Sequence, residues 1–263
     1  MTDLQTLLDI MSSLRDPDSG CPWDQKQTYE SIVPHTLEEA YEVADTIERG
    51  DFDELRDELG DLLFQIVFYA QLAKEESRFE FSDVVAAISE KLIHRHPHVF
   101  ADKKFANADD QTAHWEAIKA EERQANTAHN NSQLDGVVKG LPALSLARKL
   151  QSRAARVGFD WPNEKGVFAK LDEEANECRA AWGDDHARSE ELGDLLFTCV
   201  NLSRHANVDP EQALRAANKK FEQRFRIMES LAHQKGISLE ALSESQWEDF
   251  WQQAKSMIVS GEA

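Results

Sequence analysis

The chain carries the octapeptide Glu-Glu-Leu-Gly-Asp-Leu-Leu-Phe at residues 190–197, and almost the same octapeptide, Asp-Glu-Leu-Gly-Asp-Leu-Leu-Phe, at residues 57–64. Each copy places a Glu and an Asp three residues apart, so both carboxylates lie on one face of a helix. The apolar run that follows predicts that the same helix continues into a core. Burying a carboxylate beside such a run is costly without a positive partner. The repeat therefore predicts one acidic helical element built twice.

A second acidic pair precedes each octapeptide at the same spacing, Glu39 with Glu42 and Glu174 with Glu177. The two predicted carboxylate sets are Glu39, Glu42, Glu58 and Asp61 in the first half, and Glu174, Glu177, Glu191 and Asp194 in the second. Mg²⁺ prefers oxygen ligands and is often shared between carboxylates and a substrate phosphate. Each set therefore predicts a Mg²⁺ site, which Mn²⁺ can also occupy.

The composition favours an all-α fold. Only 11 Gly and 7 Pro occur among 263 residues, and long stretches follow the helical period. Length and internal repetition together favour two domains. We expect tandem helical bundles at residues 1–123 and 141–263, joined by a polar linker at residues 124–140. Thr36-Leu37-Glu38-Glu39 has the form of a capping box, which predicts a helix from Thr36 to about Gly50.

The formal charge of −20 argues against a nucleic-acid-binding protein, because affinity for a phosphate backbone comes mostly from Lys and Arg. An anionic small substrate would then need metal ions between it and the carboxylates. The cysteines Cys21, Cys178 and Cys199 show no paired spacing, which suits a reducing cytoplasm. Neither a signal peptide nor an 18-residue apolar run is present, so we expect a soluble cytoplasmic protein and no membrane partner.

A Lys and an Arg four residues apart follow each acidic element, Lys91 with Arg95 and Lys220 with Arg224. Two cations on one helix face suit a phosphate chain, although a solvated basic face explains the pair equally well. Alignment of the two halves also places Trp115 beside Trp251.

Three chemistries use helical carboxylates. A ferritin-like di-iron site needs Glu-x-x-His motifs, and no histidine here has an acidic residue three positions before it. A His-Asp phosphohydrolase needs that adjacent pair, which is absent. Hydrolysis of a polyphosphate by metal-activated water uses both the acidic and the basic elements, and is the chemistry we favour.

The chain resembles the MazG family of nucleoside triphosphate pyrophosphohydrolases, in its two-repeat bacterial form. The family motif, Glu-Glu-x-x-Glu followed by Glu-x-x-Asp, matches twice, at Glu38, Glu39, Glu42, Glu58 and Asp61, and at Glu173, Glu174, Glu177, Glu191 and Asp194. The resemblance extends to residues 20–24 and 95–100. It implies an all-α fold of the dimeric-dUTPase-like type, a homodimer, and Mg²⁺-dependent cleavage of nucleoside triphosphates to monophosphates and pyrophosphate, in cleaning the nucleotide pool.

The resemblance also assigns residues. Glu174, Glu177, Glu191 and Asp194 match the family's metal ligands. The expected catalytic residues are Glu173, Glu174, Lys220 and Arg224. The expected substrate-binding residues are Lys170, Glu173, Glu190, Asn201, Lys220, Arg224 and Trp251. Glu173 is the candidate to orient or deprotonate water, and a surface role explains it equally well. Stacking on Trp251 tolerates any base, which predicts broad nucleotide specificity.

The two halves differ seven residues after the Asp of each octapeptide, where Asn201 stands in the second half and Phe68 in the first. Asn201 can place an amide near the metal or nucleotide, although a buried amide satisfied by its own surroundings is the simpler explanation. We expect the second repeat to carry most of the activity and the first to be structural or regulatory. The rival classes are a non-catalytic acidic scaffold and a Nudix-type enzyme, whose Arg-Glu-x-x-Glu-Glu box is missing.

Overall fold

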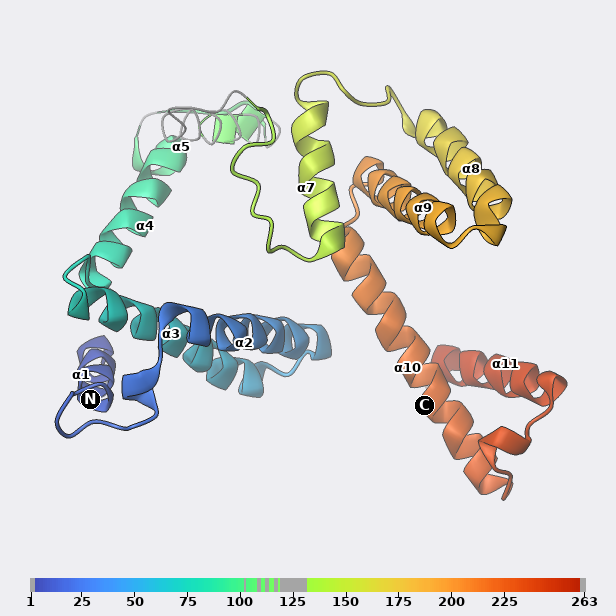
Figure 1. Ribbon diagram of the computed structural model, residues 1–263, viewed down its shortest axis with the longest axis horizontal. Coiled ribbons are helices and arrows are strands. Elements are labelled where there is room, and N and C mark those ends of the chain that lie inside the picture. The colour runs from blue at the N-terminus through green and yellow to red at the C-terminus, as the bar shows by residue number, and fades with distance from the viewer. Residues whose placement is uncertain are drawn as a thin grey trace. The chain divides into compact units, whose positions relative to one another are not determined.

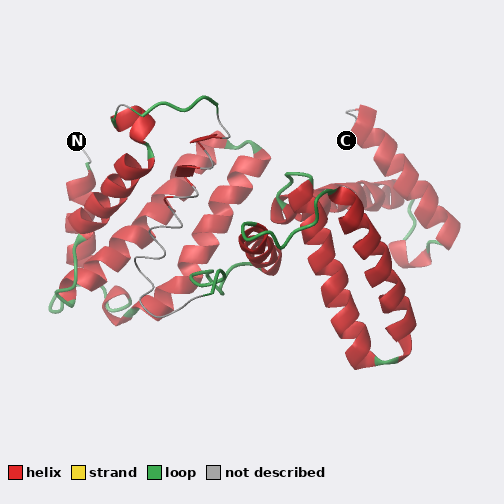
Figure 2. Cartoon of the chain, turned by 90° about the horizontal axis from the view of Figure 1, so that it is seen from above, coloured by secondary structure: helices red, strands yellow, loops and turns green. Residues whose placement is uncertain are grey.

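The computed structural model describes residues 3–101, 103–107, 110, 111, 114, 115, 118 and 132–260. Every regular element within these residues is a helix, which confirms the all-α prediction (Figures 1 and 2). Contacts between Cα atoms divide the chain into two compact units, Met1–Gln124 and Ala125–Ala263. Residues 124–131 of the predicted linker lie outside the described residues. None of the described helices is long and apolar enough to cross a bilayer.

The first unit is built around the hairpin of two long helices. Its elements are α1 (Leu4–Leu14), a 3₁₀ turn (Asp24–Lys26), α2 (Tyr29–Arg49), α3 (Phe52–Glu75), α4 (Phe81–Arg95) and the short α5 (Pro97–Phe100). Gly50 ends α2 in the left-handed conformation (φ 74°), which a residue without a Cβ adopts freely. Its core residues come from α1, α2 and α3, and they are Met11, Ile32, Val67, Phe68 and Leu72.

The expected start of α2 at Thr36 is wrong. The helix begins at Tyr29, because Thr28 and Ser31 form the capping box instead. Pro34 sits in the second turn, where it removes only one backbone hydrogen bond. Thr36 lies inside the helix, and its hydroxyl is 2.8 Å from that of Tyr69 on α3. The Thr36 hydroxyl therefore links the two helices of the hairpin.

The second unit contains two hairpins (Figure 1). Its elements are α7 (Ala143–Ala155), α8 (Glu164–Ala180), a 3₁₀ turn (Ala181–Gly183), α9 (Asp185–His205), α10 (Pro210–Gln234), a second 3₁₀ turn (Leu239–Ala241) and α11 (Glu244–Ser260). An ion pair between Arg148 and Asp209 ties α7 to the start of α10. The second hairpin has its own core, made of Met228, Ala232, Leu242, Phe250 and Ala254.

A polar cluster fixes the loop before α8 to the end of α9. Asp160 in that loop pairs with Arg204 and lies 3.1 Å from Nε2 of His205. Arg204 also donates through Nε and Nη2 to Oδ1 of Asn201, at 3.2 and 2.7 Å. Further along the loop, the Trp161 ring packs so closely on Gly166 that a Cβ there would lie 2.2 Å from it. Only glycine fits this contact, which sets how the loop enters α8.

Candidate metal and nucleotide site

Three carboxylates converge between α8 and α9. Glu174 comes from α8, while Glu191 and Asp194 come from α9, and one oxygen of each lies within 4.8 Å of the others. Glu174 is 3% exposed, Glu191 is half-buried and Asp194 is exposed. Burial raises the pKa of Glu191, and the negative charges of its acidic neighbours raise it further. The cluster is therefore electrostatically unfavourable unless a cation neutralises it.

Lys170 neutralises part of this charge. Its Nζ lies 2.7 Å from Oε1 of Glu174, four residues further along α8, and 2.9 Å from Oε1 of Glu173, three residues further along. The hydrogen bonds to Glu173 and Glu174 raise the pKa of Lys170. The other oxygen of Glu174, Oε2, is buried and meets no hydrogen-bond partner among the residues that the structure describes. A buried carboxylate oxygen left in this state is costly, and it needs a ligand.

The first unit repeats the arrangement between α2 and α3. Glu39 comes from α2, while Glu58 and Asp61 come from α3, and one oxygen of each lies within 4.8 Å of the others. Burial is the largest cause that raises the pKa of Glu39, followed by the charges of Asp61 and Glu42. The pKa of Glu58 is raised by burial and then by Glu42. Glu42, and Glu177 in the second unit, lie beside these trios without belonging to them.

Oxygen-only donor sets of this kind fit a hard divalent cation. Mg²⁺ and Mn²⁺ favour carboxylates, whereas Zn²⁺ sites are usually built from His and Cys. Within the described residues, no other group of acidic, His or Cys side chains converges in this way. The buried Oε2 of Glu174 gives the second trio the stronger fit, because it is a buried carboxylate oxygen without a hydrogen-bond partner among the described residues.

The predicted phosphate and base ligands lie on the other hairpin of the second unit. The guanidinium carbon of Arg224 lies 5.3 Å from the ring centroid of Trp251, and Arg224 Nε is buried without a described partner. Lys220 is exposed on the same helix. Among the described residues, neither Lys220 nor Arg224 forms an ion pair with the carboxylate trio. The structure therefore brings Arg224 and Trp251 together, but it does not bring them into contact with the metal ligands.

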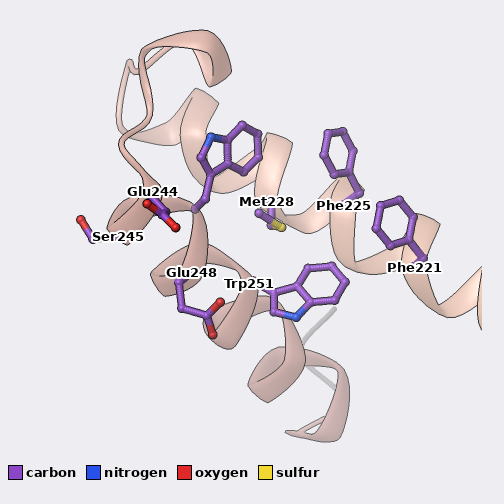
Figure 3. A pocket seen from close by; sticks show the side chains of 8 residues that line it. Phe221, Phe225, Met228, Glu244, Ser245, Glu248 and Trp251 are labelled. Carbon is purple, nitrogen blue, oxygen red and sulfur yellow. The ribbon is translucent and has the colours of Figure 1, made fainter. Parts of the chain in front are cut away.

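Sequence reasoning missed the aromatic residues around Trp251. Phe221, Phe225 and Trp247 line a pocket of about 690 Å³ together with Trp251 (Figure 3). The signal was available, because Phe221 and Phe225, like Trp247 and Trp251, stand four residues apart on one helix face. Their pairing across two helices is not visible in the sequence.

The remaining predicted ligands have partners of other kinds. Glu190 is exposed and its Oε2 lies 3.2 Å from Nδ1 of His186. Asn201 is 5% exposed, and its Oδ1 accepts from Arg204 as described above. This contact satisfies the amide oxygen within the unit, so a direct role of Asn201 in ligand binding stays a prediction.

Comparison with known proteins places these sites in a family. A model of the MazG nucleotide pyrophosphohydrolase domain matches residues 27–100, which include the first carboxylate trio. A nucleoside triphosphate pyrophosphohydrolase of Escherichia coli K12 is 51% identical over 263 residues, which cover 98% of this chain and 99% of the relative. The nucleoside triphosphate pyrophosphohydrolase/pyrophosphatase MazG of Thermotoga maritima is 44% identical over 95% of both chains. A nucleoside triphosphate pyrophosphohydrolase of Mycolicibacterium smegmatis is 30% identical over 98% of this chain and 73% of its own length.

Proposed function

The chain belongs to the MazG family of nucleotide pyrophosphohydrolases, and we propose that it hydrolyses nucleoside triphosphates to monophosphates and pyrophosphate in a Mg²⁺-dependent reaction. The observation that carries the metal requirement is the buried, unpartnered Oε2 of Glu174 in an oxygen-only trio. Glu174, Glu191 and Asp194 would hold the ion, with Glu177 beside them. When bound, the metal lowers the pKa of water and offsets the charge of the phosphates.

The chain's own side chains have separate tasks around that centre. Lys170 holds Glu173 and Glu174 in place through one ammonium group. Glu173 is exposed at the edge of the trio, where its carboxylate can orient a water molecule or accept its proton. Glu190, the acid before the ligand Glu191, is exposed on α9, and we place it in the surroundings of the substrate.

Lys220 and Arg224 supply the positive charge that the substrate needs. Charge-assisted contacts from both would offset the triphosphate, and Arg224 has a buried Nε available for one. Trp251, beneath the Arg224 guanidinium, would stack on the base. Stacking reads no hydrogen-bonding pattern, so the enzyme accepts a broad range of bases, which suits cleaning of the nucleotide pool.

A homodimer is part of this proposal. The α8–α9 hairpin leaves large apolar side chains exposed beside its acidic face, among them Leu192 (41%), Leu196 (59%) and Phe197 (43%). Apolar side chains gathered on one helix suit an interface between subunits. All three cysteines are free, which suits the reducing cytoplasm where we place the protein. With a net charge of −20, its partners are metal-bound nucleotides, not nucleic acids.

We assign most of the activity to the second repeat. Both repeats have an acidic trio, but the second adds Lys170 and the orphaned Glu174 oxygen. Glu174→Gln and Glu39→Gln make matched variants, because they alter corresponding ligands in the two units. We expect Glu174→Gln to abolish pyrophosphate release and Glu39→Gln to retain it. The reverse pattern would place catalysis in the first repeat.

The reaction itself is tested by its products. Wild-type protein with Mg²⁺ and a panel of triphosphates should yield monophosphate and pyrophosphate in equal amounts, separated by ion-exchange chromatography. Chelation of the metal should stop the reaction, and Mn²⁺ should restore it. Release of orthophosphate and a diphosphate would overturn the proposal, since it would show cleavage at the other phosphoanhydride bond. An acidic scaffold without catalysis would yield no product and show no metal-dependent change in thermal stability.

A further inference from the structure

Acidic side chains line the pocket between α10 and α11, and two cations lie near the Trp251 ring at one end of it. At the Trp251 end, the guanidinium carbon of Arg224 and Nζ of Lys255 lie 5.3 and 6.0 Å from the indole centroid. At the other end, Glu244 and Ser245 line the pocket from the first turn of α11 (Figure 3). A ligand that bears its negative charge at one end and hydrogen-bond donors at the other matches this polarity.

The pocket has an aromatic wall between these ends. Phe221 and Phe225 stack with centroids 6.1 Å apart, and Phe225 stacks on Trp247 at 6.3 Å. Phe221 also meets Trp251 at 5.8 Å. Phe221 is 58% exposed, so much of this wall is open to a ligand. A flat aromatic ring, such as a nucleobase, can stack on it.

Glu248 stands one turn before Trp251 on α11 and lines the same pocket. The two residues stand three apart, so they are neighbours on one face of α11, and Figure 3 shows both among the side chains that line the pocket. Gln252 donates from Nε2 to Oε1 of Glu248 at 2.5 Å, which holds the carboxylate in one orientation. Among the described residues no donor reaches the other oxygen, Oε2. A base stacked on Trp251 would therefore present an edge to an oriented carboxylate with a free acceptor.

A carboxylate selects among base edges because it only accepts hydrogen bonds. The Watson–Crick edge of guanine carries two adjacent donors, N1–H and the 2-amino group, which together fit a carboxylate. Hypoxanthine lacks the 2-amino group, and uracil places a single N–H between two carbonyl oxygens that a carboxylate repels. We propose that Glu248 reads the base edge and gives the pyrophosphohydrolase a graded preference for guanine nucleotides. This inference rests on the proposed function.

An organic cation is the other ligand that aromatic rings and carboxylates can bind. Arg224 and Lys255 argue against it, because both already lie over Trp251 and would repel a second cation. The same two cations favour the phosphate end of a nucleotide. The pocket therefore fits an anion with a donor-bearing base better than a cation.

GTP and ITP test the inference, because they differ only in the 2-amino group. A hydrogen bond to a charged group changes an equilibrium by about tenfold or more. We expect wild-type kcat/KM to be about tenfold higher for GTP than for ITP. The ratio of kcat/KM for GTP to that for UTP should be larger still. Glu248→Gln should bring the GTP-to-ITP ratio close to one while ITP turnover changes little. Asp249→Asn removes the same charge from the next residue of α11, outside the pocket lining, and should keep the wild-type ratio.

An equal GTP-to-ITP ratio in the wild type, or an unchanged ratio in Glu248→Gln, would overturn the inference while leaving the pyrophosphohydrolase activity intact. Loss of pyrophosphate release from every nucleotide would instead refute the proposed function. Equilibrium titration of tryptophan fluorescence with GTP and ITP, without added metal, gives the affinity ratio independently of turnover. Glu248→Gln should reduce that ratio as well, and equal affinities in the wild type would also refute the base-reading role.

Discussion

Replacement of Asn201 by alanine separates its structural role from ligand binding. Asn201 is 5% exposed and accepts two hydrogen bonds from Arg204, whose side chain is itself only 16% exposed. Asn201→Ala leaves Asp160 as the main partner of Arg204 and removes the amide oxygen that accepts from its Nε. An unsatisfied buried donor costs about 1–3 kcal/mol, so we expect a loss of about 2 kcal/mol in the free energy of unfolding. For a chain of this size that corresponds to roughly 4–8 °C in Tm.

Thermal unfolding followed by circular dichroism, with the metal chelated, measures this loss. Asn218→Ala is the control, because it removes an exposed amide from α10 and should melt with the wild type. Combined with Asp160→Asn, the Asn201→Ala loss should be less than additive, since both residues act through Arg204. The reasoning is refuted if Asn201→Ala melts like the wild type while KM for nucleoside triphosphates rises about tenfold, because the amide would then serve the substrate.

Four further variants probe the site and its surroundings. Lys220→Ala and Arg224→Ala should each lower kcat/KM at least tenfold with little change in Tm, because charge-assisted phosphate contacts are lost; wild-type rates in both would leave the pair as a solvated basic face. Glu191→Gln should reduce the rise in Tm that Mg²⁺ gives the wild type, as seen by differential scanning fluorimetry with and without metal. The hydrogen bond from Arg204 is the main cause that lowers the pKa of Asp160, so its stabilising effect is full above the unfolded pKa of about 3.9 and is lost as pH falls through the lower folded value. Asp160→Asn should therefore destabilise the protein at pH 7, and in urea titrations its difference from the wild type should shrink as the pH falls below about 3.9; a difference that stays constant as the pH falls would contradict the assignment.

The sequence predicted two sets of four carboxylates, and three of each set converge in the structure, because helical geometry and a short connection fix their positions. Residues three apart share a helix face, so Glu191 and Asp194 had to point the same way once their helix was recognised. Pairing with Glu174 followed from the short connection between the two acidic helices, which makes them neighbours. Local spacing and chain connectivity therefore determine most of the site's acidic half.

The features that escaped prediction depend on choices between competing local signals or on distant contacts. Thr28 and Thr36 both stand at plausible helix starts, and only the packing of Ile32 into the core shows that the helix already exists before Thr36. Arg204 and Asp160 are 44 residues apart, so nothing in the local pattern pairs them. The Phe221–Trp251 contact likewise requires α10 and α11 to fold back on each other.

A single position distinguishes the two acidic motifs, whose carboxylates match. Lys170 stands four residues before Glu174, and His35 stands four residues before Glu39. Lys170 contacts the ligand Glu174 itself, whereas Nδ1 of His35 lies 3.7 Å from Glu38, the neighbour of the ligand. Lysine carries a positive charge at neutral pH, and Lys170 places that charge directly on the ligand. A triphosphate that approaches the second trio would meet an ammonium group bound to the ligand Glu174 itself, whereas at the first trio the charge of Arg49 acts on Glu58. This difference supports our proposal that the second repeat carries most of the activity.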